Sequence, residues 1–498
     1  MSDTPEGKIR VEDYVKGDLT KDTNWWGAFV VGLAGTILVT GVTPPILANL
    51  GAAGIPNFIF WTLSGWLLCL FLAELAAMLP DRTGGAPAYA YYAFKDRLPK
   101  AYPHINGVTM WMYWLGWMPV MAVNMILTAA YLPTIFNFTP SGFWANTVHL
   151  FSVDVTYFTL ILGTFLSFVL LAISNRGIRF GTEAATVLGV LSMIPLTVIA
   201  VAPFLTGHVS GANIWPPHLP DGTAFFTGHS FYLFLQFSAL FTWNAIAMEA
   251  AACYIGECKN PDRDAPLAMG LSGGYGTFIY TFLPMAVLGV LGVKFIIASP
   301  DPNAVLVETA VRAIGSGVAK LVTISLIIAL ALSSLNAIMG CARSLYMMSL
   351  DGQAPRIFGH VNKHNVPNVS MWMNTILNIL LIFVGAPGAI YVLSNVGYVG
   401  SFIPVLIGYY FLRKWRPEIH RPFKLPEWMK YVALALAALY FVAWGPGIIS
   451  CAIEGCQPGG MKMFIIGVIV VLLYFPLSMW RKSEDKRHGT TEHKVTTS

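Results

Sequence analysis

The chain carries little charge for its length. Only 11% of its 498 residues are Asp, Glu, Lys or Arg, whereas a soluble globular protein carries about 25%. Hydrophobic residues make up 56%, and the mean hydropathy is +0.63. This composition predicts an integral membrane protein. The net charge of +5 does not indicate a nucleic-acid partner, because the positive residues lie between hydrophobic runs.

Further absences limit the function classes. The first 25 residues hold no short apolar stretch, so no secretory signal peptide is predicted. The ten histidines fall in loops, tails or span ends, and none pair at metal-ligand spacing inside a hydrophobic run. No nucleophile motif such as G-x-S-x-G stands out. We therefore predict no metal site, no cofactor and no catalytic residue, and we disfavour a membrane enzyme.

Cysteine is also scarce, with six residues in the chain. Four of them lie in or at the end of apolar runs and are predicted to be packing residues. The other two, Cys451 and Cys456, lie near a predicted helix end, and the sequence leaves open whether they form a disulfide.

Twelve hydrophobic runs are long enough to cross a bilayer, which takes about 20 apolar residues. These predicted spans are residues 26–50, 55–79, 108–136, 155–173, 185–205, 231–255, 271–297, 321–348, 369–384, 389–412, 431–451 and 463–480. If they alternate in direction, all but four of the 30 Lys and Arg residues fall on one side. The exceptions are Lys294, Arg312, Lys320 and Lys462. Positive residues collect in cytoplasmic loops, so both termini are predicted to lie in the cytoplasm, with the chain in the plasma or inner membrane.

The first span contains LVTGVTPPILANLG, residues 38–51. Proline lacks an amide donor and clashes with the preceding turn, so the helix is expected to unwind before Pro44 and Pro45 and to restart there. Backbone freed inside a membrane must line a cavity or meet a ligand, and a new helix N-terminus suits an anion such as a carboxylate. A kink that serves only packing is the alternative. The predicted backbone cradle is Thr40, Gly41, Val42 and Thr43.

The sixth span reads FTWNAIAMEAAACYIGECKNP, residues 241–261, and carries Glu249 where hydrocarbon is expected. The first and sixth spans are the equivalent first helices of two five-helix halves. Matched interruptions in two halves indicate the binding site of a secondary transporter. We therefore expect an interruption at residues 244–247, although this stretch contains neither proline nor glycine. An unbroken helix is the alternative.

Four stretches match one known family in order along the chain. They are PDRTGGAPAYAYYAF (80–94), GECKNPDRDAP (256–266), ARSLYMMSLDGQAPRIFGHVNKHNVPNVS (342–370) and RPEIHRPFKLP (416–426). Each alone is a weak signal. Together they resemble the amino acid–polyamine–organocation (APC) permeases over residues 36–426.

The resemblance implies an all-α, LeuT-like membrane fold with twelve transmembrane helices. Five helices, with the first broken, would occupy residues 26–205. An inverted repeat of five, with its own first helix (the sixth) broken, would occupy 230–412, and two extra helices 431–480. Residues 1–25 and 481–498 would be cytoplasmic segments.

The resemblance also implies site residues. The arginine/agmatine exchangers of this family carry a sixth-helix Trp-x-x-x-Gly-x-Glu pattern, and WNAIAME (243–249) is similar. Trp243 would then be a gating aromatic over the substrate, and Glu249 the buried carboxylate beneath it. The stretch YWLGWMPVMAVNMILTAAYL (113–132) likewise implies that Met121 and Asn124 face the pocket. The predicted substrate-binding residues of the sixth span are Trp243, Asn244, Ala245, Ile246 and Ala247.

Glu249 has three open interpretations. A carboxylate at the bilayer centre costs about 2.5–3.5 kcal/mol on insertion scales, so it must be protonated, paired or in contact with water. It serves proton coupling or gating, stabilises loose backbone of the broken helix, or binds a substrate amine directly. Glu74, near the inner end of the second span, is expected to make a helix-end or inter-helix polar contact.

The coupling ion is not fixed by the sequence. Ser333 and Ser334 on the eighth span form a candidate sodium site, because hydroxyl and carbonyl oxygens suit a hard cation. Serine pairs are also common packing residues in membrane helices.

The resulting prediction is a secondary transporter that moves amino acids, by proton coupling or exchange, as a monomer or homodimer. An amine or polyamine transporter and a sodium symporter are alternatives. A channel is disfavoured because it would show charge rings or repeated filters. A receptor built on a carrier fold stays open.

Overall fold

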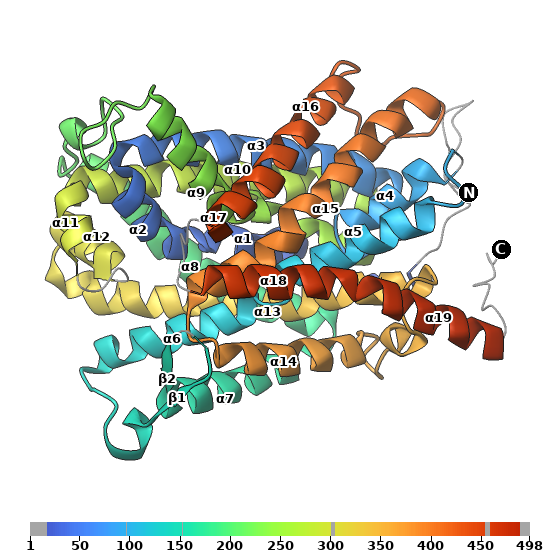
Figure 1. Ribbon diagram of the computed structural model, residues 1–498, viewed down its shortest axis with the longest axis horizontal. Helices are drawn as coiled ribbons and strands as arrows, with labels where there is room; N and C mark the ends of the chain where they lie inside the picture. Colours follow the sequence, from blue (N-terminus) through green and yellow to red (C-terminus); the bar gives the residue numbers. More distant parts are fainter. Residues whose placement is uncertain (1–16, 96, 152, 300–303, 454–458, 489–498) are drawn as a thin grey trace.

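The computed structural model of the chain describes residues 17–95, 97–151, 153–299, 304–453 and 459–488. Helices dominate it (Figure 1). Those of the first half are α1 Trp25–Ile37, α2 Val39–Leu50, α3 Gly54–Met78, α4 Pro87–Phe94, α5 Tyr102–Trp117, α6 Val120–Phe136, α7 Tyr157–Ser174 and α8 Ile178–Leu205. Those of the second half are α9 Gly228–Ile246, α10 Pro261–Leu291, α11 Val293–Ala298, α12 Ala304–Ile314, α13 Ala319–Leu350, α14 Asn368–Ile382 and α15 Pro387–Trp415. The last are α16 Met429–Val442, α17 Ile448–Ile453, α18 Gly460–Leu472 and α19 Tyr474–His488.

Short segments connect these helices. The 3₁₀ segments are η1 Gly51–Ala53, η2 Gly142–Ala145, η3 Gly211–Asn213, η4 Ala247–Glu257, η5 Ser316–Val318 and η6 Arg356–Gly359, and η7 Ala443–Gly447 is a π-helix. Strands β1 Thr147–His149 and β2 Asp154–Thr156 form an antiparallel pair with Thr147 opposite Thr156. Cys451 is disulfide-bonded, and Cys456 lies outside the described residues.

Membrane-length helices account for most of the described chain. Nine helices there are long and apolar enough to cross a membrane, or ten if a bent pair in the sixth span counts as one. The first of the nine, Trp25–Met78, has 54 residues, enough for two crossings of about 20 residues each. Asn368–Ile382 is a shorter apolar helix. The prediction of an almost entirely helical, multi-pass membrane protein is confirmed, while twelve spans in a 5+5 arrangement stay a prediction.

Several long helices pack together at the centre of the molecule. The α3 helix lies along α10, and α1 packs against η4, α10, α8 and α13. The α5 helix packs along α15, and α13 packs against α6 and α8. Trp243 and Glu249 of the sixth span are buried among these helices.

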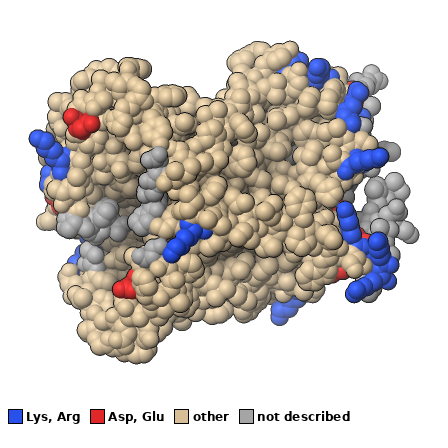
Figure 2. All heavy atoms as spheres, viewed as in Figure 1, with Lys and Arg blue, Asp and Glu red and all other residues tan. Residues whose placement is uncertain are grey.

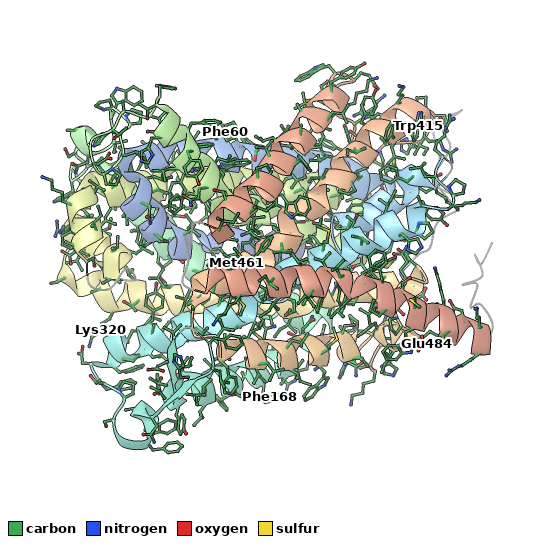
Figure 3. All side chains as sticks on the ribbon, in the orientation of Figure 1. Phe60, Phe168, Lys320, Trp415, Met461 and Glu484 are labelled. Atoms are coloured by element: carbon green, nitrogen blue, oxygen red, sulfur yellow. The ribbon has the colours of Figure 1, made fainter. Side chains whose placement is uncertain are left out.

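Charge and apolar surface are separated on the molecule. Lys and Arg gather at the end of the long axis where α19 finishes, and the flanks in this view are almost free of charge (Figure 2). Phe60 and Phe168 lie on opposite flanks in Figure 3, where they are 44% and 42% exposed. Exposed aromatic side chains on both flanks fit a surrounding of lipid.

Candidate functional site

The first and sixth spans approach each other closely at α1 and η4. A Cβ atom at Gly35 would lie only 2.1 Å from the Ala247 carbonyl oxygen, so the contact requires glycine. The Tyr280 hydroxyl of α10 lies 3.1 Å from the Gly35 carbonyl oxygen and 3.0 Å from that of Asn244. One tyrosine therefore links the ends of α1 and α9.

The interruption in the first span lies at Leu38, between α1 and α2. The expectation that residues 40–43 unwind and that the helix restarts at the prolines is wrong. Those four residues belong to the start of α2, and Pro44 and Pro45 lie inside that helix.

Each proline in this stretch removes only one hydrogen bond of the helix. The amides missing at Pro44 and Pro45 would have reached the carbonyl groups of Thr40 and Gly41 four residues earlier, and α2 continues through both prolines. The Thr40 hydroxyl donates to the Ile37 carbonyl oxygen at 3.0 Å and the Thr43 hydroxyl to that of Val39 at 2.7 Å, on either side of Leu38. The predicted cradle residues consequently remain beside the interruption, as the first turns of α2.

The sixth span changes its winding at the predicted stretch. The α-helix ends at Ile246, and eleven residues of 3₁₀-helix follow, Ala247–Glu257. Runs of 3₁₀-helix longer than three or four residues are uncommon, and a mid-helix stretch often marks a hinge. A bend of 57° between Gly228–Ser238 and Phe241–Glu257 lies further upstream and was not predicted.

The η4 segment is held by the loop after α3 and by the helix α4 that follows this loop. Tyr89 donates to the Ala252 carbonyl oxygen at 3.1 Å, and Thr83 donates to that of Cys253 at 2.6 Å. Gly84 and Gly85 have φ angles of 93° and 87°, a left-handed conformation that favours glycine. The Gly-Gly pair therefore lets this loop turn beneath the 3₁₀-helix.

Glu249 accepts hydrogen bonds from three aromatic side chains. Tyr113 of α5 donates at 2.9 Å, Trp117 of α5 at 3.3 Å and Tyr398 of α15 at 2.6 Å. All four side chains are buried. In the described part of the chain no Lys or Arg forms an ion pair with Glu249. The carboxyl group thus bridges the sixth span to α5 and α15 through hydrogen bonds alone.

Trp243 lies among three further aromatic rings. Its ring centroid is 5.5 Å from that of Trp117, 5.7 Å from Tyr391 and 5.2 Å from Tyr398. Its indole nitrogen donates to the Gly116 carbonyl oxygen at 3.2 Å. Trp243 is fully buried, so these rings form a closed layer directly next to the Glu249 cluster.

The layer also reaches the start of α2. A Cβ atom at Gly41 would lie 3.5 Å from the Tyr391 hydroxyl and 3.9 Å from Leu127 of α6. The Tyr391 hydroxyl is buried and finds no hydrogen-bond partner among the described residues. The structure thus joins the predicted residues of the first and sixth spans through Tyr391.

The other predicted residues surround this centre. Met121 and Asn124 are buried on α6, and Val42, Ala245 and Ile246 are buried on their own helices. Asn124 donates to the Ser334 hydroxyl at 3.1 Å, and Ser334 donates to the Leu330 carbonyl oxygen at 2.9 Å. Ser334 is thus directed at α6. The buried Ser333 hydroxyl finds no partner among the described residues.

The third span has a break that the sequence analysis did not predict. The α5 helix ends at Trp117 and α6 begins at Val120, with Pro119 between them. The predicted single span 108–136 is therefore two helices. Tyr113 and Trp117, which donate to Glu249, precede the break, and Met121 and Asn124 follow it.

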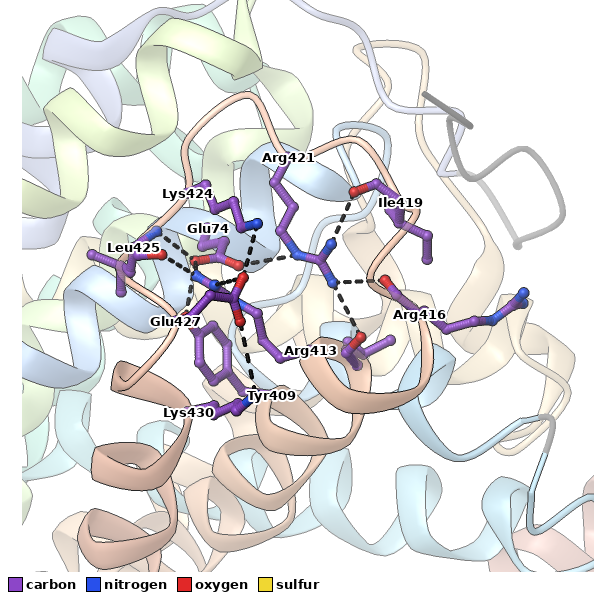
Figure 4. Close-up of polar contacts among 11 residues, drawn as sticks. Glu74, Tyr409, Arg413, Arg416, Ile419, Arg421, Lys424, Leu425, Glu427 and Lys430 are labelled. Atoms are coloured by element: carbon purple, nitrogen blue, oxygen red, sulfur yellow. Dashed lines mark hydrogen bonds and ion pairs between the residues drawn. The ribbon is translucent and has the colours of Figure 1, made fainter. Parts of the chain in front are cut away.

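A second buried carboxylate holds the loop after α15, residues 416–428 (Figure 4). Glu74 accepts from Arg413 at 2.5 Å, from Tyr409 at 2.9 Å and from the Leu425 amide at 2.9 Å. Arg421 lies 3.1 Å away. The prediction of an inter-helix polar contact for Glu74 is confirmed.

The same loop carries Glu427, which pairs with Lys424 at 2.8 Å and with Arg413 at 3.2 Å. The hydrogen bond from Lys424 lowers the pKa of the Glu427 carboxyl group. Glu427 therefore stays ionised and continues the network to the surface of the loop.

Two more buried ion pairs connect segments that are distant in the sequence. Arg82 pairs with Asp351 at 2.7 Å, and Arg343 pairs with Glu257 through both guanidinium and carboxylate arms. The second pair fixes the end of η4 to α13. Removing one partner of a buried ion pair leaves the other charge uncompensated and destabilises the protein, so we expect both residues to be needed for this contact.

Sequence reasoning missed Tyr113, Trp117, Tyr391 and Tyr398 as site residues. A signal was present, because Tyr113 and Trp117 are four residues apart and therefore lie on one helix face. Tyr391 and Tyr398 are seven residues apart and share a face in the same way. Aromatic residues at such spacing are also typical of packed cores, which is why the pattern alone did not identify them.

Comparison with known proteins adds to this geometry. A profile described as "Amino acid permease" matches residues 24–478. An uncharacterized transporter of Legionella pneumophila is 25% identical over 89% of this chain and 94% of its own length. The branched-chain amino acid permease BcaP of Bacillus subtilis is 24% identical over 60% of each chain. A cadaverine/lysine antiporter of Escherichia coli is 24% identical over 72% of this chain and 74% of its own.

Proposed function

The chain belongs to the amino acid permease family, and from that premise we propose that it moves amino acids across the cell membrane as a secondary transporter. The observation that carries the proposal is the meeting of two interrupted spans beside a buried carboxylate. Gly35 and Ala247 touch there, and Glu249 lies two residues further on. Irregular backbone at membrane depth is expected where it lines a substrate site.

The substrate would lie between α2 and the aromatic layer. The first amides of α2, around Thr40, Gly41, Val42 and Thr43, would receive its carboxylate, because a helix N-terminus favours an anion. Trp243, Met121 and Asn124 would contact its side chain, and the backbone of residues 244–247 its ammonium group.

Trp243 is proposed as the gate. Its ring contacts with Trp117, Tyr391 and Tyr398 join α9, α5 and α15, so it would lie between the proposed substrate position and Glu249. Relative movement of α9, α5 and α15 would separate these rings. The closed layer accordingly corresponds to a state in which the pocket is shut toward one side.

Glu249 is proposed as the coupling group. Its three donors can hold an ionised carboxylate, and a tyrosine hydroxyl can turn to accept from a neutral one. Opening the layer would let water reach the carboxyl group and allow proton exchange. Proton coupling or exchange is therefore favoured over sodium coupling, for which Ser333 and Ser334 remain the candidate residues.

The proposed topology has twelve spans and two inverted halves, residues 26–205 and 230–412, followed by helices over 431–480. The separation of charge in Figure 2 supports cytoplasmic placement of the Lys- and Arg-rich end. We propose that both termini lie in the cytoplasm and that the protein lies in the plasma or inner membrane.

Transport of an amine is the second candidate, and the likeness to the cadaverine/lysine antiporter favours it. Thermal stabilisation of the detergent-purified protein separates the two. The panel holds amino acids, the amines formed by their decarboxylation, and polyamines, in sodium and in potassium buffer. Stabilisation by amino acids but not by the matching amines supports the carboxylate cradle. Stabilisation by amines alone contradicts it and makes Glu249 or the carbonyl groups of the sixth span the recognition elements.

A further inference from the structure

The break in the third span is bridged by a side chain from another helix. In an unbroken helix the Ala122 amide would donate to the Met118 carbonyl oxygen four residues earlier. Here Ala122 donates instead to the side-chain oxygen of Asn378 at 2.7 Å. The side-chain nitrogen of Asn378 donates to the Met118 carbonyl oxygen at 2.6 Å. The carboxamide of α14 is thus inserted into one rung of the hydrogen-bond ladder.

The insertion is chemically specific. The rung needs one acceptor for the amide and one donor for the carbonyl, and a carboxamide supplies both at once. Pro119 opens the ladder further, because it has no amide donor for the Leu115 carbonyl oxygen four residues earlier. Insertion of a side chain into the ladder is a recognised cause of a kink. Asn378 is only 1% exposed, so water does not take its place.

A second asparagine on the same face extends the contact. Asn374, one turn earlier on α14, accepts from the Trp114 indole at 2.7 Å, and Asn378 donates to the Asn374 carbonyl oxygen at 2.8 Å. Two amides thus hold the third span on both sides of its break. This break differs from the change of winding at Ala247, because the Met118 carbonyl oxygen and the Ala122 amide are both satisfied by the Asn378 side chain.

We propose that Asn378 is a positioning residue that fixes the angle between α5 and α6. This angle sets the position of the predicted pocket residues on α6 relative to the Glu249 cluster. Tyr113 and Trp117 hold Glu249 from one arm of the kink. Met121 and Asn124 lie on the other arm. A change in the angle between α5 and α6 would move Met121 and Asn124 relative to Tyr113 and Trp117, with all four residues still present. The functional part of this inference rests on the proposed transport of amino acids.

Asn378→Asp is the diagnostic variant. A neutral carboxyl group has one donor and one acceptor, so it can replace the carboxamide in the rung, whereas an ionised one has only acceptors and faces the Met118 carbonyl oxygen. The ratio of the variant's KM to the wild-type KM should therefore be near one at low pH and rise about three- to tenfold at high pH, the range of one lost hydrogen bond. Using the ratio removes any pH dependence that the wild type has itself.

Thr375→Val is the matched control. Thr375 is buried on the same helix, and among the described residues its hydroxyl bonds only the Met371 carbonyl oxygen of its own helix, at 2.9 Å. The control should keep the wild-type KM and pH profile. A KM ratio for Asn378→Asp that does not change with pH, or a control that behaves like it, contradicts the positioning role.

A second readout needs no substrate. Spin labels at Lys100 and Phe138, exposed positions beyond the two ends of the third span, report the angle of the kink as a distance. Asn378→Leu removes the hydrogen bonds to the Ala122 amide and the Met118 carbonyl oxygen. It should therefore shift the distance between the spin labels in the purified protein, whereas Thr375→Val should not. An unchanged distance in folded Asn378→Leu overturns the inference. A shifted distance in a protein that transports no amino acid leaves the inference on the kink standing and refutes the proposed function.

Discussion

Replacing Glu249 separates its two possible contributions, hydrogen bonding and charge. Glu249→Gln keeps an acceptor oxygen for Trp117 and Tyr398, which both bond the same carboxylate oxygen. The new amide nitrogen would face the Tyr113 hydroxyl, which can accept as well as donate. Every group in the cluster then keeps a partner. We expect the free energy of unfolding of this variant to lie within about 2 kcal/mol of the wild type.

Glu249→Leu removes the acceptor for all three donors. Each buried donor left without a partner costs about 1–3 kcal/mol, so the loss sums to about 3–9 kcal/mol. That is comparable with the whole stability of a typical domain, about 5–15 kcal/mol. Thermal unfolding in detergent should therefore show Glu249→Gln near the wild type and Glu249→Leu severely destabilised or unfolded.

Transport in proteoliposomes tests the charge. If Glu249 exchanges a proton during the cycle, uptake by Glu249→Gln is slower and its pH profile is flat, although the protein is folded. A folded Glu249→Gln with the wild-type rate and pH profile refutes the coupling role. A Glu249→Leu protein as stable as the wild type refutes the hydrogen-bond accounting.

Three more predictions follow from other contacts. Gly35→Ala places a Cβ atom 2.1 Å from the Ala247 carbonyl oxygen, so we expect uptake to be lost, and normal uptake would show that the two interruptions need not touch. Glu257→Gln leaves Arg343 buried without its counter-charge, which should cost about 3–5 kcal/mol and lower the unfolding temperature in detergent; an unchanged midpoint would contradict this. Replacing sodium by potassium should leave uptake unchanged, because the Ser334 hydroxyl is already bonded to Asn124 and Leu330. Uptake that depends on sodium would contradict this and support a sodium site at Ser333 and Ser334.

Composition and pattern were enough to predict a multi-pass helical membrane protein and its family. The low charge and long apolar runs determine the first, because water is unavailable in a bilayer to satisfy an irregular backbone. The family was predicted from four stretches that resemble it in the same order along the chain, since together they are more specific than any one alone.

The positions of the interruptions were less predictable. Pro44 and Pro45 suggested unwinding just before them, but each removes only one hydrogen bond, the helix continues through both, and the interruption lies at Leu38. The kink at Pro119 was not predicted because the side chain that stabilises it, Asn378, lies 256 residues after Ala122 in the sequence. Local patterns do not report such contacts.

The aromatic cluster shows the same limit. The carboxylate of Glu249 was conspicuous in an apolar run, whereas its donors came from two other spans and looked like ordinary core residues. A single sequence shows which groups are costly to bury. It does not show which distant groups compensate that cost.

The central claim is that this chain transports an amino acid through a site closed by Trp243. Its most direct test is uptake of a radiolabelled amino acid, chosen as the best stabilising ligand, into proteoliposomes containing the wild type or Trp243→Ala, with protein-free liposomes as control. The account predicts time-dependent uptake by the wild type that Trp243→Ala reduces while the ligand still stabilises the variant. Uptake by the wild type no greater than in protein-free liposomes, or equal uptake by the two proteins, would contradict it.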